Sequence, residues 1–249
     1  MKKGGQITVF FIIAILLIIS TGIVLVVTNK VSIPSIGSSR HLSPEFEEIE
    51  STMKSCVKQR AIDAIRLVGI QGGYTTLTRD YLETNLTNVA YGYYEGKNTL
   101  PRLEVIEKEI SNYVKDTIPY CLNPEDFSEY NITLSKSSAE TKIKDGLVDV
   151  TGLISISIKK QERSLIADRK YSSEIPINLK EIIKIAEKTI NKIIEDPEYI
   201  PVGYLAETDF FIIVLPIDEK RYIIGITQNK TETNIEGVPY TFLFAVKKK

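Results

Sequence analysis

The chain has 249 residues, of which 43% are hydrophobic and 25% are charged, and this balance excludes a mostly disordered chain. Lys2, Lys3 and Lys30 are the only charged residues among the first 30, so the net charge of −1 leaves 28 basic and 32 acidic residues, a formal −4, for the rest of the chain. A mildly acidic domain does not point to nucleic-acid binding, and no nucleic-acid partner is expected.

An uncharged apolar run extends from Ile7 to Val27. As a helix, these 21 residues would extend about 31 Å, close to the ~30 Å hydrocarbon core of a bilayer. The run predicts one transmembrane helix over residues 7–27, with the lipid bilayer as its partner. Lys2 and Lys3 precede the run, so the positive-inside rule keeps residues 1–6 in the cytoplasm. The expected localisation is therefore the cytoplasmic membrane, single-pass, with the N-terminus inside and the C-terminal domain outside.

Residues 28–42 are rich in serine and are expected to form a stalk between the membrane and the domain. Residues 43–249 are expected to form one extracytoplasmic domain, with a helical part over 43–125 and a sheet-rich part over 126–249. The predicted fold class is α+β, with helices packed on a mainly antiparallel sheet.

Two helices are predicted in the first part of the domain. The first begins at Ser43-Pro44-Glu45, where Ser can cap the helix and Pro suits its first turn, and it ends near Gly69. The second runs from about Pro101 to Ile118, and Cys121 follows it by one turn. The apolar stripe of the first helix consists of Phe46, Ile49, Met53, Cys56, Ala61, Ile65 and Val68.

The second part of the domain shows strand patterns around one further helix. Asp145-Gly146 lies between two alternating apolar segments and predicts a two-residue hairpin. Asn178, with Glu181 three residues later, predicts a capping box for a helix that ends before Pro197. Further strands are predicted over residues 173–177, 210–215, 222–227 and 240–246.

The chain has two cysteines, Cys56 and Cys121. Outside the cytoplasm two cysteines are usually paired, and this pair would stabilise the fold by roughly 4 kcal/mol in the chain-entropy model. A metal site is not expected, because two thiolates without a neighbouring His leave the coordination shell half empty. The sequence therefore predicts a disulfide and no metal or other cofactor.

Tyrosine is dense between the two predicted helices, at Tyr81, Tyr91, Tyr93 and Tyr94. Tyr91, Tyr93 and Tyr94 are candidates for a binding surface, because tyrosine rings can stack on sugars or form a protein contact. The alternative is that these rings pack the seam between helix and sheet. Candidate glycosylation sites, which fit an exposed outer domain, are Asn85, Asn131 and Asn229.

The sequence lacks the motifs of common catalytic sites, and its paired carboxylates, such as Glu47 and Glu48, are expected by chance among 32 acidic residues. The only histidine, His41, lies in the predicted stalk, and no H-E-x-x-H, G-x-S-x-G or Walker A pattern occurs. No catalytic residue is predicted, and the chain is not expected to be an enzyme.

The N-terminus carries a resemblance to a known family. Lys2-Lys3-Gly4-Gly5-Gln6, followed by the apolar run, resembles the class III signal of archaeal type IV pilin-like precursors, which implies cleavage between Gly5 and Gln6. The fifth residue counted from Gln6 is Phe10, where that family commonly has Glu. More broadly, the segments KKGGQITVFFIIAILL, SCVKQRAIDAIRLVGIQGGY, YGYYEG and IPYCL resemble a group of uncharacterised archaeal single-span surface proteins, over roughly half of the chain. That resemblance implies no known activity.

These observations leave three main hypotheses of function. The first is a single-pass, membrane-anchored cell-surface protein with a structural or interaction role. The second is a pilin-like filament subunit processed between Gly5 and Gln6. The third is a module that binds glycans or envelope polymers through the tyrosines. Expected partners are the membrane and either other envelope proteins or further copies of the chain.

Overall fold

The structure is a computed structural model, and it describes residues 44–77, 80–123, 125–198, 200–228 and 234–249. The predicted transmembrane span over 7–27, the stalk, the candidate cleavage site at Gly5 and Gln6, and the candidate glycosylation site Asn229 lie outside these residues. Within the described ranges, no helix is long and apolar enough to cross a bilayer. Residues 48–249 belong to one unit, whose architecture is given below.

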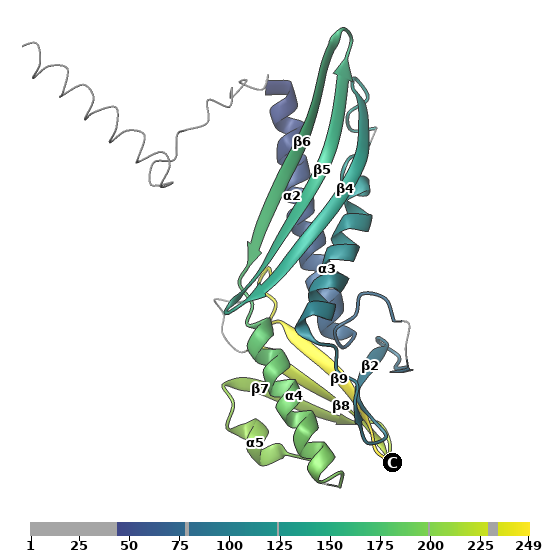
Figure 1. Cartoon of the computed structure of the whole chain (residues 1–249), viewed down its shortest axis with the longest axis vertical. Coiled ribbons are helices and arrows are strands. Elements are labelled where there is room, and N and C mark those ends of the chain that lie inside the picture. Colours follow the sequence, from purple (N-terminus) through teal and green to yellow (C-terminus); the bar gives the residue numbers. More distant parts are fainter. Residues whose placement is uncertain (1–43, 78–79, 124, 199, 229–233) are drawn as a thin grey trace, which may run out of the picture. The chain divides into compact units, whose positions relative to one another are not determined.

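Two helices from the first part of the domain lie side by side (Figure 1). They are α2 (Pro44–Ile70) and α3 (Leu103–Thr117), and a short 3₁₀ helix, η1 (Ile118–Cys121), continues from α3. The predicted stripe of α2 is buried at Ile49, Met53, Ala61, Ile65 and Val68, which confirms its periodicity. On α3 the buried residues are Ile106, Ile110 and Val114.

A disulfide links these two helical segments. Cys56 on α2 is bonded to Cys121 on η1, with a Cα–Cα distance of 5.6 Å. The structure therefore places the two cysteines at disulfide distance, as predicted.

A three-stranded antiparallel sheet with the order β4-β5-β6 packs beside the helices (Figure 1). Its strands are β4 (Asn131–Lys144), β5 (Leu147–Lys160) and β6 (Arg163–Ile175). The turn at Asp145-Gly146 joins β4 to β5 and confirms the predicted hairpin. Gly152 of β5 faces the helices closely: a Cβ there would lie 2.9 Å from Ile118 Cδ1 and 3.3 Å from Val57 Cγ1. The sheet therefore packs closely against α2 and η1 at Gly152.

A second sheet contains strands from both ends of the domain, in the order β1-β2-β9-β8-β7, with β3 paired to β2. Its strands are β1 (Tyr81–Leu82), β2 (Val89–Tyr94), β3 (Lys97–Asn98), β7 (Phe210–Pro216), β8 (Arg221–Gln228) and β9 (Thr241–Lys247). All its pairs are antiparallel except β2 with β9, which is parallel. The predicted α+β class with a mainly antiparallel sheet is confirmed. The helical and sheet-rich parts are interleaved, however, because β2 from the first part pairs with β9 from the second.

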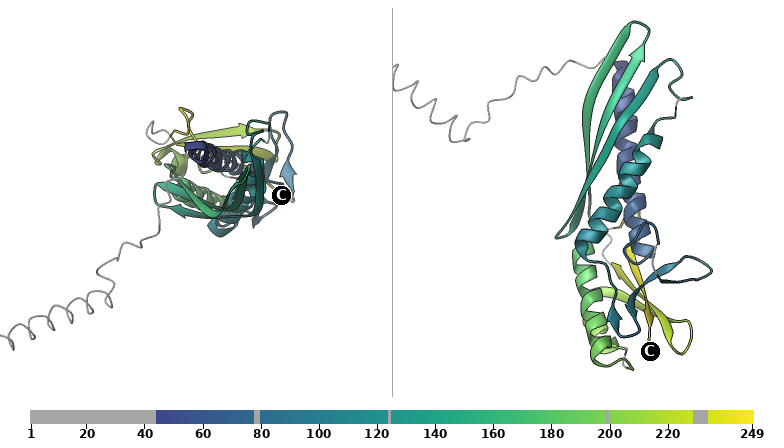
Figure 2. Two further views of the ribbon diagram at one scale, coloured as in Figure 1. Left: turned by 90° about the horizontal axis from the view of Figure 1, so that it is seen from above. Right: turned by 45° about the vertical axis from the view of Figure 1, so that its right-hand side comes forward.

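Helix α4 (Leu179–Glu195) covers one face of this second sheet, as Figure 2 shows. A Cβ at Gly92 of β2 would lie 2.8 Å from Phe244 Cδ2 and 3.1 Å from Ile190 Cδ1, so α4 and β9 meet at this glycine. A short helix, α5 (Val202–Ala206), follows α4 and leads into β7.

The start of α4 differs from the predicted capping box. Asn178 is the N-cap residue, but its side chain makes no capping hydrogen bond. The backbone N–H of Asn178 instead donates to Oε1 of Gln228 at 3.1 Å. A side chain from β8 therefore accepts a hydrogen bond from the first N–H of the helix that has no partner within it.

Candidate functional site

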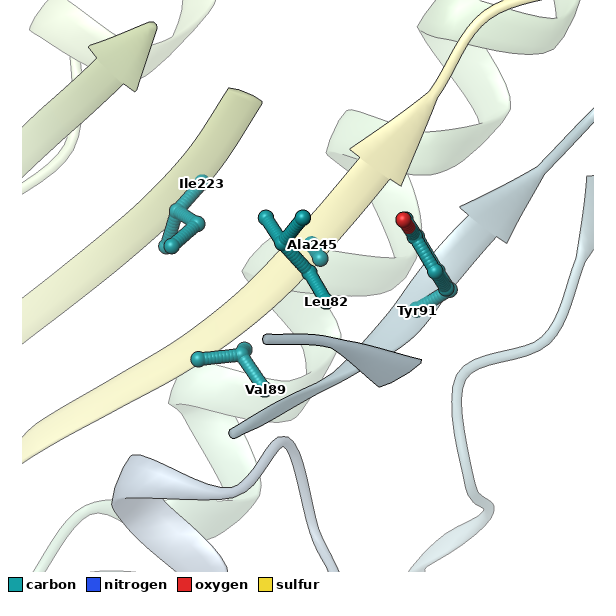
Figure 3. Close-up of a cluster of buried hydrophobic side chains, with 5 residues drawn as sticks. All are labelled: Leu82, Val89, Tyr91, Ile223 and Ala245. Carbon is teal, nitrogen blue, oxygen red and sulfur yellow. The ribbon is translucent and has the colours of Figure 1, made fainter. Parts of the chain in front are cut away.

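The tyrosine cluster is part of the core rather than an exposed surface. Tyr91 is 8% exposed and Tyr93 is fully buried. Figure 3 shows Tyr91 in a hydrophobic cluster with Leu82, Val89, Ile223 and Ala245. These two rings cannot stack on a ligand without unfolding the sheet, so the structure contradicts the binding-surface interpretation for them and supports the packing alternative.

Tyr94 is half-buried and contacts Lys247 at the end of β9. Its ring lies edge-on to Tyr91, with centroids 5.1 Å apart, and Lys247 Nζ lies 4.6 Å from the centre of the Tyr94 ring. Lys247 also donates to the Tyr94 hydroxyl at 3.2 Å and forms an ion pair with Glu95 at 2.6 Å, which lowers the pKa of the Glu95 carboxyl. The strand end at Lys247 is therefore anchored.

Two of the candidate glycosylation sites lie in the described part of the chain. Asn85, in the loop between β1 and β2, and Asn131, the first residue of β4, are both exposed. Both are accessible to modification, and their glycosylation stays a prediction.

The strand β7 is an unusual edge of the second sheet, because residues 210–217 carry no charge. Phe211 and Leu215 point to the same side of the strand and are 58% and 49% exposed, and Ile217 beyond the strand is 45% exposed. Edge strands of natural sheets are commonly protected by charged residues, and this segment has none.

The backbone register shows which groups of β7 face outward. The Ile217 N–H donates to the Arg221 carbonyl at 2.9 Å, so the residues of β7 at odd positions bond to β8. The backbone N–H of Gln228 donates to the Tyr240 carbonyl at 2.9 Å. This bond agrees with the alternation, because residues of β8 at even positions bond to β9. Phe210, Ile212 and Val214 therefore turn their N–H and C=O groups to the free edge. Pro216, which lacks an N–H, occupies the last outward position.

A pocket of about 440 Å³ lies where α4 and β7 begin and β8 ends. Its lining is mostly polar, and it consists of Asn178, Glu181, Ile185, Tyr204, Glu207, Thr208, Asp209, Phe210 and Gln228. Three of these residues are acidic and none is basic. Sequence reasoning missed the pocket, because its residues lie in three separate segments whose pairing a single sequence does not show.

Burial affects two polar side chains of the pocket: it shifts the pKa of Tyr204, and it leaves the Gln228 amide without a hydrogen-bond partner. Desolvation, with a contribution from the negative charge of Glu181, raises the pKa of Tyr204. Gln228 is 2% exposed, and because its Oε1 accepts the Asn178 N–H, its Nε2 amide is the group left without a hydrogen-bond partner. The pocket therefore combines net negative charge with one unpaired buried donor.

No group of three or more His, Cys, Asp or Glu side chains within the described ranges is arranged to hold a metal ion. No protein-family model matches the chain, and neither a curated protein nor a solved structure shows significant similarity to it.

Proposed function

We propose that the chain is a single-pass, membrane-anchored cell-surface protein with a structural or interaction role, whose β7 edge pairs with an extended segment of a partner polypeptide. The transmembrane helix over residues 7–27 holds the protein in the cytoplasmic membrane. The domain from residue 43 onward lies outside and carries no catalytic activity.

The location is supported by the cysteine pair. Disulfides persist in oxidising compartments and are rare in the cytosol of most organisms. The pairing of Cys56 with Cys121 thus fits a domain on the outer side of the membrane. Exposed acceptors at Asn85 and Asn131 fit the same side.

The observation that carries the interaction role is the uncharged free edge of β7 over residues 210–215. An incoming strand would form hydrogen bonds with the outward N–H and C=O groups of Phe210, Ile212 and Val214. It would also cover the exposed side chains of Phe211 and Leu215. Strand addition of this kind gives affinity through main-chain bonds and selectivity through alternate side chains. The partner segment is expected to be extended and apolar, because β7 offers no charge to pair with.

The proposal is tested by placing a charge on the edge. Phe211→Lys should abolish the contact, because a lysine on an edge strand opposes strand pairing. The assay is site-specific photo-crosslinking in the native membrane from a photoreactive residue at position 215. A discrete adduct is expected in the parent protein and should be lost in the Phe211→Lys variant.

The matched control is Ile166→Lys on β6, which changes an 80% exposed isoleucine to lysine on the other sheet. This variant should keep the adduct. An adduct that persists in Phe211→Lys, with thermal stability unchanged in both variants, would contradict the assignment of β7 as the interaction surface.

The pilin-like filament subunit remains the alternative proposal. It is supported by the resemblance of Lys2-Lys3-Gly4-Gly5-Gln6 to a class III signal. In such a filament, β7 would join one copy of the chain to the next. The distinguishing result is a mature N-terminus at Gln6 together with a cross-linked adduct of two identical chains.

A further inference from the structure

The pocket beside β7 has the chemistry of a ligand site. We propose that it binds an amino sugar, that is, a hydroxylated ring carrying a protonated primary amine. This inference does not depend on strand addition at β7, because it rests on different side chains. It also gives the glycan-binding hypothesis a site other than the buried tyrosines.

The charge of the pocket selects for a cation. Glu181, Glu207 and Asp209 line it, and no lysine or arginine among the residues that the structure describes does. Lys184 pairs with Glu181 at 3.3 Å, whereas Glu207 and Asp209 form no ion pair with any residue that the structure describes. A protonated amine placed among these carboxylates gains attraction, and an acidic ligand would be repelled.

The unpaired amide of Gln228 requires a ligand that also carries a hydrogen-bond acceptor. A buried donor without an acceptor destabilises the site, and an ammonium group has no lone pair to offer it. A ligand hydroxyl can accept a hydrogen bond from the Gln228 Nε2 amide and, through its own O–H, donate a hydrogen bond to a carboxylate. The ligand is therefore expected to carry oxygen acceptors together with its amine.

The size and walls of the pocket favour a sugar ring over a lysine side chain. Small-molecule sites typically enclose about 300–1,000 Å³, and this pocket, at about 440 Å³, falls within that range. Asn178, Thr208 and Gln228 add hydrogen-bonding groups that an ammonium on an alkyl stem would leave unused. Ile185 and Phe210 supply an apolar wall suited to the C–H face of a ring.

The test is isothermal titration of the full chain in detergent micelles with glucosamine, N-acetylglucosamine, glucuronate and lysine amide. Glucosamine should bind saturably. N-acetylglucosamine, which keeps the ring but lacks the positive charge, should bind at least tenfold more weakly, and glucuronate should not bind. Lysine amide, which has the charge without the ring hydroxyls, should also bind at least tenfold more weakly than glucosamine.

Variants assign the binding to this pocket. The double variant Glu207→Gln/Asp209→Asn should weaken glucosamine binding at least tenfold. Glu140→Gln/Glu219→Gln, a pair of exposed acids outside the pocket lining, is the control and should bind as the parent does.

Four results would overturn the proposal, and the first three are no saturable binding of glucosamine, equal binding of glucosamine and N-acetylglucosamine, and binding unchanged by the pocket variant. Lysine amide binding as tightly as glucosamine would replace the sugar with a simple cation and would also refute it. None of these outcomes bears on the β7 cross-link, so the two proposals fail separately.

Discussion

Removal of the disulfide is expected to be the largest single perturbation of stability outside the core. Cys56 and Cys121 are separated by 65 residues, and in the chain-entropy model closing a loop of this size stabilises the folded state by about 4 kcal/mol. Replacing both cysteines by alanine should therefore lower the free energy of unfolding by about 4 kcal/mol. At roughly 2–4 °C per kcal/mol for a domain of this size, Tm should fall by about 8–16 °C.

The assay is urea and thermal unfolding of the full chain in detergent, followed by circular dichroism. Reduced parent protein should match the double variant, and reductant should leave the variant unchanged. A loss below about 1 kcal/mol would refute the loop-closure reasoning. Alkylation of both thiols in protein isolated without reductant would refute the pairing itself.

Three further changes test the packing. Gly92→Val should cost about 1–3 kcal/mol, because its Cβ would lie 2.8 Å from Phe244 Cδ2 of β9 and 3.1 Å from Ile190 Cδ1 of α4; an unchanged urea midpoint would show that β9 and α4 do not pack closely there. Tyr93→Ala should cost about 3–5 kcal/mol, whereas Tyr93→Phe should be neutral or stabilising, because the buried Tyr93 hydroxyl has no partner; equal losses in chemical denaturation would contradict this. Burial raises the pKa of Tyr171 and of Tyr222 to about 12, so the stability they contribute is complete below pH 10 and should be lost as the pH rises from 10 to 12. Phenylalanine at both positions should flatten this alkaline loss, which unfolding at graded pH measures.

Local patterns predicted the elements that depend on local physics. The stripe on α2 and the Asp145-Gly146 turn follow from helical periodicity and hairpin geometry, and both were confirmed. The strand β6 begins at Arg163, ten residues before the predicted start at Ser173. Its first eight residues, RSLIADRK, lack the regular alternation of apolar and polar side chains, so they are a weak strand signal.

The strand β2 could not be predicted from its own residues. Its partner β9 follows about 150 residues later and pairs with it in parallel, with Tyr91 opposite Ala245. Such a pairing is set by the whole fold, so from the sequence the tyrosines of β2 fitted either a binding surface or packing, and the sheet buries Tyr91 and Tyr93. The pocket was missed for the same reason, since Gln228 meets the start of α4 only after β8 has joined the sheet.

The most direct test of the central claim is the intact mass and N-terminal sequence of protein taken from native membranes, without reductant and after deglycosylation. For an anchored domain outside the membrane, we expect an uncut chain that retains Lys2 and Lys3 and whose cysteines resist alkylation. A chain that begins at Gln6 would contradict the permanent anchor and favour the filament subunit. Recovery of the chain in the soluble cytoplasmic fraction with free thiols would contradict both.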